Sequence, residues 1–282
     1  MEYALVVRWL LLFAALWAVG LPLSARLFRR LPGRGAGLAL PVSLVALTLP
    51  AYYVGHLSFG PVALVAGVGT LLVASAVAGL DFGALRRGDR RLAPGLDIDR
   101  RAVADAAAVF LVAFLFAVAL RALDPAVHAG GGEKFLDFGL LQSLARASVL
   151  PPEDMWFAGE PVRYYYGGHL ASILLARLTA TDPSFAYNLA LAGFFGVLVT
   201  AAFELGRGVA TAAGANGRLG GLLSAFFVAS PATSSPRGGF SSPRSPRGCA
   251  GPSRGPSPSG RNTPSSRCSP GPRTSRTGAR AA

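Results

Sequence analysis

The sequence predicts an all-α membrane protein: a polytopic transmembrane helix bundle with an amphipathic interfacial helix in an outer loop and a disordered C-terminal tail. Of the 282 residues, 52% are hydrophobic and only 15% are charged, whereas about a quarter of the residues in soluble domains are charged. Apolar runs of about 20 residues recur, the length that crosses ~30 Å of hydrocarbon as a helix. The short connections between several of these runs are rich in arginine. A lipid bilayer is therefore the expected environment.

Six apolar segments are predicted to cross the membrane, and a seventh begins but stops too early to cross. The first is interpreted as an uncleaved span, because its apolar stretch is long for a secretory signal and no clear cleavage site follows it. The predicted spans are 4–23, 38–54, 61–80, 103–120, 164–180 and 185–209, with the incomplete one at 219–230. The chain divides accordingly into 1–122 (four transmembrane helices), 123–163 (extracytoplasmic loop), 164–230 (two transmembrane helices and an incomplete third) and 231–282 (tail).

Two arginine clusters predict the orientation. One, at 26–34, follows the first span, and the other, at 86–101, follows the third. Short basic loops stay on the cytoplasmic side of a membrane. We therefore expect a multi-pass protein of the cell membrane whose N-terminus and 123–163 loop are extracytoplasmic. On this topology Glu204 and Arg207 lie near the outer end of the sixth span.

The net charge of +13 arises mostly from the tail, where nine arginines and no acid lie between Pro231 and Ala282. One interpretation is a disordered basic tail. The other is an out-of-frame reading of a GC-rich gene, indicated by a single lysine in the whole chain, Lys134, and favoured because the composition changes inside an unfinished span. The nucleotide sequence around codon 230 distinguishes the two. No nucleic-acid partner is expected, and both cysteines, Cys249 and Cys268, lie in this tail, so the first 230 residues offer no thiol ligands.

The 123–163 loop holds most of the candidate chemistry. Apolar residues at helical spacing from Phe135 to Leu144 predict an amphipathic helix in the membrane interface. Glu133 and Asp137 are four residues apart and would share one face of that helix, where paired carboxylates can act as a base and a ligand. Taken singly, each acid is more often a solvated loop residue, and Asp137 also suits a helix N-cap. The other acids of the loop are Asp124, Glu153, Asp154 and Glu160.

A tyrosine triplet, Tyr164, Tyr165 and Tyr166, follows the loop. Tyrosines collect at membrane interfaces, but successive helical residues are turned by about 100°, so at least one should face the protein interior or a substrate. His169 lies one turn further, where a structural hydrogen bond and a cavity-facing role are both open. With His128 isolated, no zinc site is expected, and no phosphate-binding loop or nucleophile elbow is present.

Three segments, EKFLDFGLLQSL, LPPEDMWFAGEPV and RYYYGGHL, together resemble the YYY family of very hydrophobic, mostly archaeal membrane proteins. The likeness covers about residues 101–207. That family is in turn distantly similar to the C-type polytopic glycosyltransferases, which use a lipid-linked sugar donor and place an essential acid in their first large outer loop. One departure is that Glu133 is followed by Lys134, where the glycosyltransferases usually have adjacent acids.

The resemblance implies a glycosyltransferase that moves sugar from a polyprenyl-phosphate donor to an acceptor on the outer face. It implies Glu133 and Asp137 as catalytic acids and Asp154 as a supporting acid. The negative charge of the donor phosphate would be balanced in one of two ways. Either a divalent cation, Mg²⁺ or Mn²⁺, is held by Asp137 and Asp154, or Arg163 contacts the phosphate. The remaining expected substrate contacts are Asp124, Tyr164, Tyr165, Tyr166 and His169. The alternative is a non-enzymatic scaffold or transporter component, although spans two to four lack the mid-bilayer ionisable residues typical of transporters. An out-of-frame tail would leave the activity to an intact homologue.

Overall fold

The structure is a computed structural model that describes residues 3–80, 99–126 and 134–230. Within these residues every regular element is a helix, apart from one isolated bridge between Glu153 and Pro161. The all-α prediction is confirmed. The helices are α1 (Tyr3–Leu27), the short η1 (Ala36–Leu38), α2 (Ala39–Gly55), α3 (Pro61–Gly79), α5 (Arg100–Leu123), α6 (Lys134–Arg146), α7 (Gly167–Leu178), α8 (Pro183–Ala212) and α9 (Gly217–Ala229).

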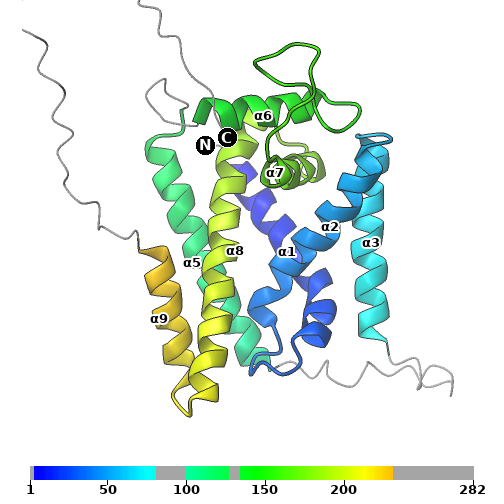
Figure 1. The fold of residues 1–282 in the computed structure, drawn as a ribbon. Helices are drawn as coiled ribbons and strands as arrows, with labels where there is room; N and C mark the ends of the chain where they lie inside the picture. The colour runs from blue at the N-terminus through cyan, green and yellow to red at the C-terminus, as the bar shows by residue number, and fades with distance from the viewer. Residues whose placement is uncertain (1–2, 81–98, 127–133, 231–282) are drawn as a thin grey trace, which may run out of the picture. The chain divides into compact units, whose positions relative to one another are not determined.

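Five of these helices are long and apolar enough to cross a membrane: α1, α2 with η1, α3, α5 and α8. They run roughly along one direction in the bundle (Figure 1). Pro61 begins α3 at a position where its missing N–H costs no hydrogen bond, and the Asp99 side chain caps α5 by accepting from the Arg101 N–H at 2.9 Å. The polytopic membrane architecture predicted from hydropathy is therefore confirmed.

The segment expected as a span over 164–180 differs from the prediction. Its helix, α7, has 12 residues, which gives a length of about 18 Å against ~30 Å of hydrocarbon. Figure 1 shows α7 nearly along its axis, so it lies across the bundle rather than parallel to the spans. Every residue from Leu170 to Ala176 is buried within the protein. The apolar sequence of α7 thus meets other helices, not lipid.

Because α7 does not cross, α8 begins at the same end of the bundle as α6 and runs to the opposite end (Figure 1). This corrects the expected place of Glu204 and Arg207. They lie at the end that carries the arginine-rich connection between α1 and α2, where Gly37 N donates to Glu204 Oε2 at 3.4 Å.

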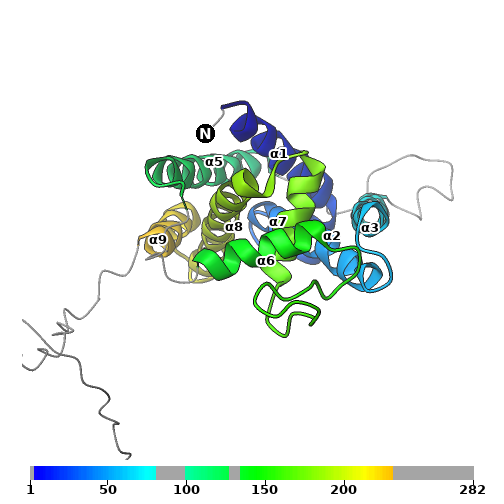
Figure 2. The same cartoon turned by 90° about the horizontal axis from the view of Figure 1, so that it is seen from above.

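The amphipathic helix is confirmed as α6, which crosses the end of the bundle (Figures 1 and 2). Leu140, Leu141 and Leu144 are buried, while Arg146 is exposed. The chain after α6 is tied to the α2–α3 turn, because Phe59 N donates to Ser148 O at 2.6 Å and Leu150 N donates to Gly55 O at 2.9 Å. These bonds fix the end of the bundle on which α6 and α7 lie.

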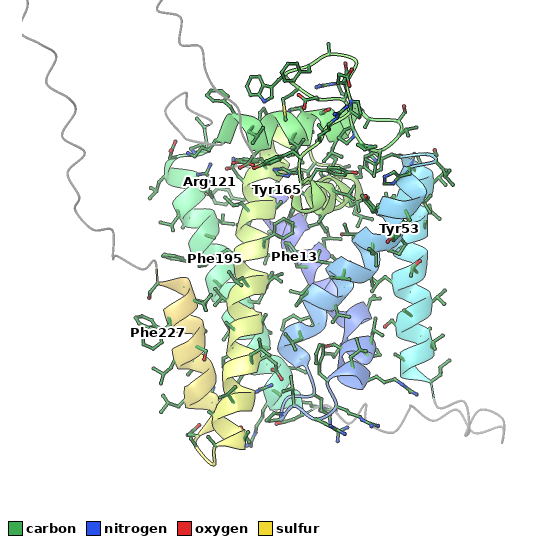
Figure 3. The ribbon with its side chains drawn as sticks, viewed as in Figure 1. Phe13, Tyr53, Arg121, Tyr165, Phe195 and Phe227 are labelled. Carbon is green, nitrogen blue, oxygen red and sulfur yellow. The ribbon has the colours of Figure 1, made fainter. Side chains whose placement is uncertain are left out.

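An aromatic cluster joins α1, α5 and α8 at the centre of the bundle. The Phe13 ring lies 5.3 Å from the Phe110 ring and 5.9 Å from the Phe114 ring, centroid to centroid, and Figure 3 shows Phe13 well inside the bundle. A Cβ added at Gly193 of α8 would collide with the Phe13 ring. The missing side chain at residue 193 therefore allows α8 to approach α1 closely, as small residues do between membrane helices.

Gly67 has a similar role between α2 and α3, and its substitution by Ala is expected to destabilise the fold. A Cβ at Gly67 would overlap the backbone carbonyl of Leu47, and backbone cannot move aside as a side-chain tip can. We expect Gly67→Ala to lower the stability by about 1–3 kcal/mol, the usual cost of overpacking, in thermal unfolding of the detergent-solubilised protein. Gly69→Ala is the matched control in the same helix, since nothing lies within 4 Å of its Cβ position. Equal stability of the two variants would refute this packing account.

Candidate functional site

A cavity of about 220 Å³ lies where α6, α7 and α8 meet. Its polar side chains are Asp137 from α6, His169 and Ser172 from α7, and Tyr187 from α8. The apolar part of the wall is formed by Leu141, Leu191 and Phe194, with Gly168 beside them. Largely apolar cavities with a few convergent polar groups are typical of ligand sites. Two residues predicted separately from the sequence, Asp137 and His169, thus come together here.

Asp137 and His169 contact each other directly. His169 Nε2 lies 3.3 Å from Asp137 Oδ1, and the side chains are 17% and 36% exposed, respectively. Burial lowers the pKa of His169, and the nearby Asp137 carboxylate opposes this shift without reversing it. At neutral pH the contact is therefore a hydrogen bond from a neutral imidazole. With the proton on Nε2, Nδ1 carries the lone pair. Nδ1 is buried, and no residue in the described part of the chain offers it a hydrogen bond.

The lowered pKa of His169 predicts a loss of stability in mild acid. As the pH falls through about 6.5, the ordinary value for histidine, the unfolded chain gains a proton before the folded one, so acid favours unfolding. We expect the melting temperature to fall between about pH 7.5 and pH 5.5, and His169→Gln to reduce that pH dependence. His56→Gln is the control, because His56 is exposed on the α2–α3 turn. An unchanged pH slope in His169→Gln would contradict the assignment.

Tyr187 connects this cavity to a second polar group. Both Asp137 and Arg121 are close enough to influence the Tyr187 hydroxyl electrostatically. Arg121 ends α5 on the α6 side of the bundle (Figure 3), and its Nε donates to Asn188 Oδ1 at 2.8 Å. Asn188 Nδ2 in turn donates to Pro125 O at 3.1 Å. Arg121 Nη2 is buried, and none of the described residues accepts a hydrogen bond from it.

Sequence reasoning missed Arg121, Tyr187 and Ser172. Arg121 follows directly on an apolar run and reads as an ordinary helix-end cation, and Tyr187 and Ser172 are single polar residues in apolar segments. Only the position of Arg121 carries a sequence signal, since it is the one basic residue in the last turn of α5.

Most of the other predicted acids support local structure. Glu133 lies outside the described residues. Asp124 Oδ2 lies 3.6 Å from Lys134 Nζ. Asp154 Oδ1 accepts from the backbone N–H groups of Trp156 at 2.7 Å and Phe157 at 3.2 Å. Asp154 therefore shapes a turn, and it is not among the residues that line the cavity.

Arg163 and the three tyrosines differ in how exposed their side chains are. Arg163 Nη2 lies 3.8 Å from Glu160 Oε2, with both side chains well exposed. Tyr164 and Tyr165 are 40% and 69% exposed, while Tyr166 is 9% exposed, which confirms that one tyrosine of the triplet faces inward. Burial and the neighbouring Tyr52 hydroxyl raise the pKa of Tyr166 to about 12, so Tyr166 stays protonated at physiological pH.

The residues expected to hold a divalent cation are not assembled into a metal site. Across the described segments, no group of three or more His, Cys, Asp and Glu side chains could hold a metal ion. In the described part of the chain Asp137 is paired with His169, and Asp154 accepts hydrogen bonds from backbone amides.

Together these observations define the class: a polytopic integral membrane protein with a largely apolar cavity, containing a few polar side chains, at one end of its bundle. A family model described as "Uncharacterized membrane protein (DUF2298)" matches residues 46–239. This match covers more than half of the chain and includes α6, α7 and α8, and the chain belongs to this family. No curated protein and no solved structure matches it.

Proposed function

We propose that this chain is a membrane glycosyltransferase that moves a sugar from a polyprenyl-phosphate donor to an acceptor hydroxyl at the α6–α7 end of the bundle. The observation that carries the proposal is the Asp137–His169 pair in the wall of the cavity. A carboxylate held by a histidine and partly open to a cavity is positioned to act as a general base. The proposal also follows from the resemblance of EKFLD, which contains Asp137, to the acidic loop motif of C-type glycosyltransferases.

In the proposed reaction Asp137 accepts the proton of the acceptor hydroxyl. The acceptor oxygen forms a bond to the anomeric carbon of the sugar, and the bond from that carbon to the donor phosphate oxygen breaks. The polyprenyl phosphate leaves with the electron pair. His169 is a positioning residue, because its Nε2–H fixes the orientation of the carboxylate before the acceptor binds. Glu133, which lies outside the described residues, is proposed as a second catalytic acid on the resemblance of EKFLD alone.

Arg121 is better suited than Arg163 to balance the charge of the donor phosphate. Arg163 is 86% exposed and paired with Glu160. Arg121 is oriented by its hydrogen bond to Asn188 and lies near Tyr187. Tyr187 is one of the residues that line the cavity. A guanidinium group recognises phosphate oxygens through parallel N–H donors, and Arg121 Nη2 is a donor for which the described residues provide no acceptor.

The proposed side of the membrane is the extracytoplasmic one. The arginine cluster at 26–34 and the α6–α7 layer lie at opposite ends of the bundle (Figure 1), and basic loops are retained in the cytoplasm. A polyprenyl-linked donor in the outer leaflet would present its sugar at the level of α6.

The test is transfer of label from a radiolabelled polyprenyl-phosphate sugar in membranes that contain the protein. We expect the Glu133→Ala/Asp137→Ala variant to abolish label transfer. Asp105→Ala is the control: Asp105 pairs with Arg218 at 2.9 Å and lies in the second turn of α5, far from the cavity end of that helix. Transfer at the wild-type rate by the double variant would rule out the proposed site.

A second candidate, a scaffold or transporter component, draws on the ion pair of Glu204 with Arg207 within α8. Ionisable residues inside membrane spans often mark transport pathways. This pair, however, holds a loop through Gly37, which is a structural role. Absence of label transfer together with normal expression would favour this second candidate.

A further inference from the structure

The connection between α6 and α7 contains a second feature at the same end of the molecule, which we call the aromatic hairpin (residues 150–165). It rises beyond α6, away from the five long helices (Figure 1). Its aromatic side chains Trp156 and Phe157 are 65% and 69% exposed, and Tyr165 is 69% exposed. Exposed apolar surface that lies beyond the membrane spans and among polar groups is a candidate binding surface.

The aromatic hairpin is held in one conformation by its own hydrogen bonds. Asp154 N donates to Glu160 O at 2.8 Å, and Val162 N donates to Pro152 O at 2.9 Å. Glu153 Oε1 accepts from Gly159 N at 2.7 Å, in addition to the two amides held by Asp154. The five residues between Glu153 and Gly159 are thus fixed at the tip, and Trp156 and Phe157 are among them.

Buried residues anchor the base of the hairpin to the bundle. Leu150 and Val162 are 3% and 5% exposed, and the Ser143 hydroxyl of α6 donates to Glu153 O. The rings of Tyr164 and Tyr165, at the C-terminal side of this base, are tilted against each other with their centroids 4.0 Å apart. A preorganised aromatic surface loses little conformational entropy when a ligand binds.

Two charged residues of the hairpin are close to these aromatic residues in sequence. Glu160 and Arg163 are well exposed and 3.8 Å apart, close in sequence to Tyr164 and Phe157. Inserting such charges into hydrocarbon is costly, so the surface is poorly suited to entering lipid. Carboxylate and guanidinium groups beside aromatic faces suit a ligand with both C–H faces and many hydroxyls, which is the chemistry of a sugar ring.

We propose that the aromatic hairpin binds the sugar portion of a glycan, with Trp156, Phe157 and Tyr165 against the ring faces and Glu160 and Arg163 on the hydroxyls. This inference rests on the proposed function, since it assigns the carbohydrate-recognising surface of the same transferase. The cavity with Asp137 performs the transfer, and the hairpin holds the glycan at the same end of the bundle.

Trp156 also provides the means to observe binding. Of the three tryptophans, Trp9 is fully buried and Trp17 is partly buried with its indole N–H on Ala36 O. Trp156 is therefore the one that a water-soluble quencher should reach readily. In nanodiscs, we expect iodide to quench the fluorescence of Trp156 and brominated lipid to leave the fluorescence of Trp156 unchanged. We expect saturating maltotetraose, mannotetraose or chitotetraose to protect it from iodide.

Calorimetric titration of the same three tetrasaccharides into the solubilised protein measures the affinity. Trp156→Ala and Tyr165→Ala are each expected to weaken binding about tenfold, the size expected for one lost aromatic contact. Phe135→Ala is the matched control, because Phe135 is an exposed aromatic residue on α6 outside the hairpin. All three residues are exposed, and an unchanged melting temperature verifies that each variant folds.

Three results would overturn the inference. One is the absence of saturable binding by all three tetrasaccharides, which would indicate a protein partner for the hairpin. Another is equal affinity of wild type and Trp156→Ala, and the third is quenching of Trp156 by brominated lipid, which would make it a membrane anchor. Asp137→Asn separates this inference from the proposed function: glycan binding retained by that variant supports the hairpin site even if no transfer is found in the wild type.

Discussion

Replacement of Asp137 by Asn is expected to reduce kcat for sugar transfer by about 10²–10⁴-fold, the usual contribution of a general base. Asn has the size of Asp, and its amide oxygen can still accept the hydrogen bond from His169 Nε2, whose distance to Asp137 Oδ1 is 3.3 Å. The neutral amide cannot take the proton of the acceptor hydroxyl. The variant should therefore bind the donor normally and fail in the chemical step.

The measurement is kcat and KM with a polyprenyl-phosphate sugar donor. His169→Gln should show a smaller loss, because Gln keeps a donor toward Asp137 while changing its position and the proton affinity of the carboxylate. The diagnostic readout for a positioning role is a displaced acid limb in the pH profile of kcat/KM. If Asp137→Asn keeps more than a tenth of the wild-type kcat, Asp137 is not the base.

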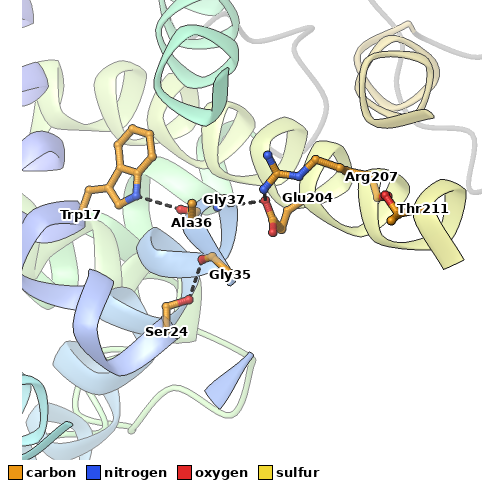
Figure 4. Close-up of polar contacts among 8 residues, drawn as sticks. All are labelled: Trp17, Ser24, Gly35, Ala36, Gly37, Glu204, Arg207 and Thr211. Atoms are coloured by element: carbon orange, nitrogen blue, oxygen red, sulfur yellow. Dashed lines mark hydrogen bonds and ion pairs between the residues drawn. The ribbon is translucent and has the colours of Figure 1, made fainter. Parts of the chain in front are cut away.

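Replacement of Glu204 by Ala is expected to have the largest effect on folding, a loss of about 3–5 kcal/mol, as when one partner of a buried ion pair is removed. Glu204 is fully buried in α8, and Arg207 Nη2 pairs with it (Figure 4). Gly37 N also donates to Glu204. Removal of the carboxylate leaves a buried guanidinium and a backbone N–H without their acceptor.

A double-mutant cycle tests this interpretation by thermal unfolding in detergent. Glu204→Ala/Arg207→Leu removes both charges and should be clearly more stable than Glu204→Ala alone. Ser24→Ala is a milder comparison in the same region, since the Ser24 hydroxyl donates a single hydrogen bond to Gly35 O at 2.7 Å (Figure 4). A double variant no more stable than Glu204→Ala would show that the ion pair does not hold this end of the fold.

The sequence predicted the long helices well because lipid and helix geometry leave few alternatives. The span expected at 61–80 is α3, Pro61–Gly79, and the one at 185–209 is contained in α8, Pro183–Ala212. An apolar run of this length with few charges has one favourable state in a membrane, a helix whose backbone hydrogen bonds are all internal. The interfacial helix was also predictable, since its buried leucines follow the helical period.

The crosswise helix α7 could not be predicted in this way. Its residues Leu170–Ala176 are as apolar as those of a span, but they are buried by protein. The hydropathy of a segment shows only that the segment avoids water. It does not show whether lipid or a neighbouring helix covers the segment. The length of 12 residues between Gly167 and Leu178 is the one signal that argues against crossing.

The candidate site was predictable only in part. Asp137 stood out as one of two acids on one face of the predicted helix, and His169 as an ionisable residue at the edge of an apolar segment. Their contact, however, joins two helices, and the two residues are 32 positions apart in sequence. The roles of Arg121 and Tyr187 depend on how α5 and α8 dock, which no local pattern encodes. For Asp154 the sequence favours no single role, because a carboxylate in a turn is equally well explained by the backbone N–H groups that donate to it.

The crosswise position of α7 also determines which helix connections share a compartment. The described residues contain five candidate spans where the sequence predicted six complete ones, so the chain after α8 emerges on the opposite side of the membrane from the one expected. The turn at 213–216 therefore faces the same aqueous phase as the arginine-rich connection at 28–35 (Figure 1). A membrane-impermeant maleimide should therefore label cysteines placed at Arg34 and at Gly214 from one side of sealed vesicles, and a cysteine at Leu57 from the other.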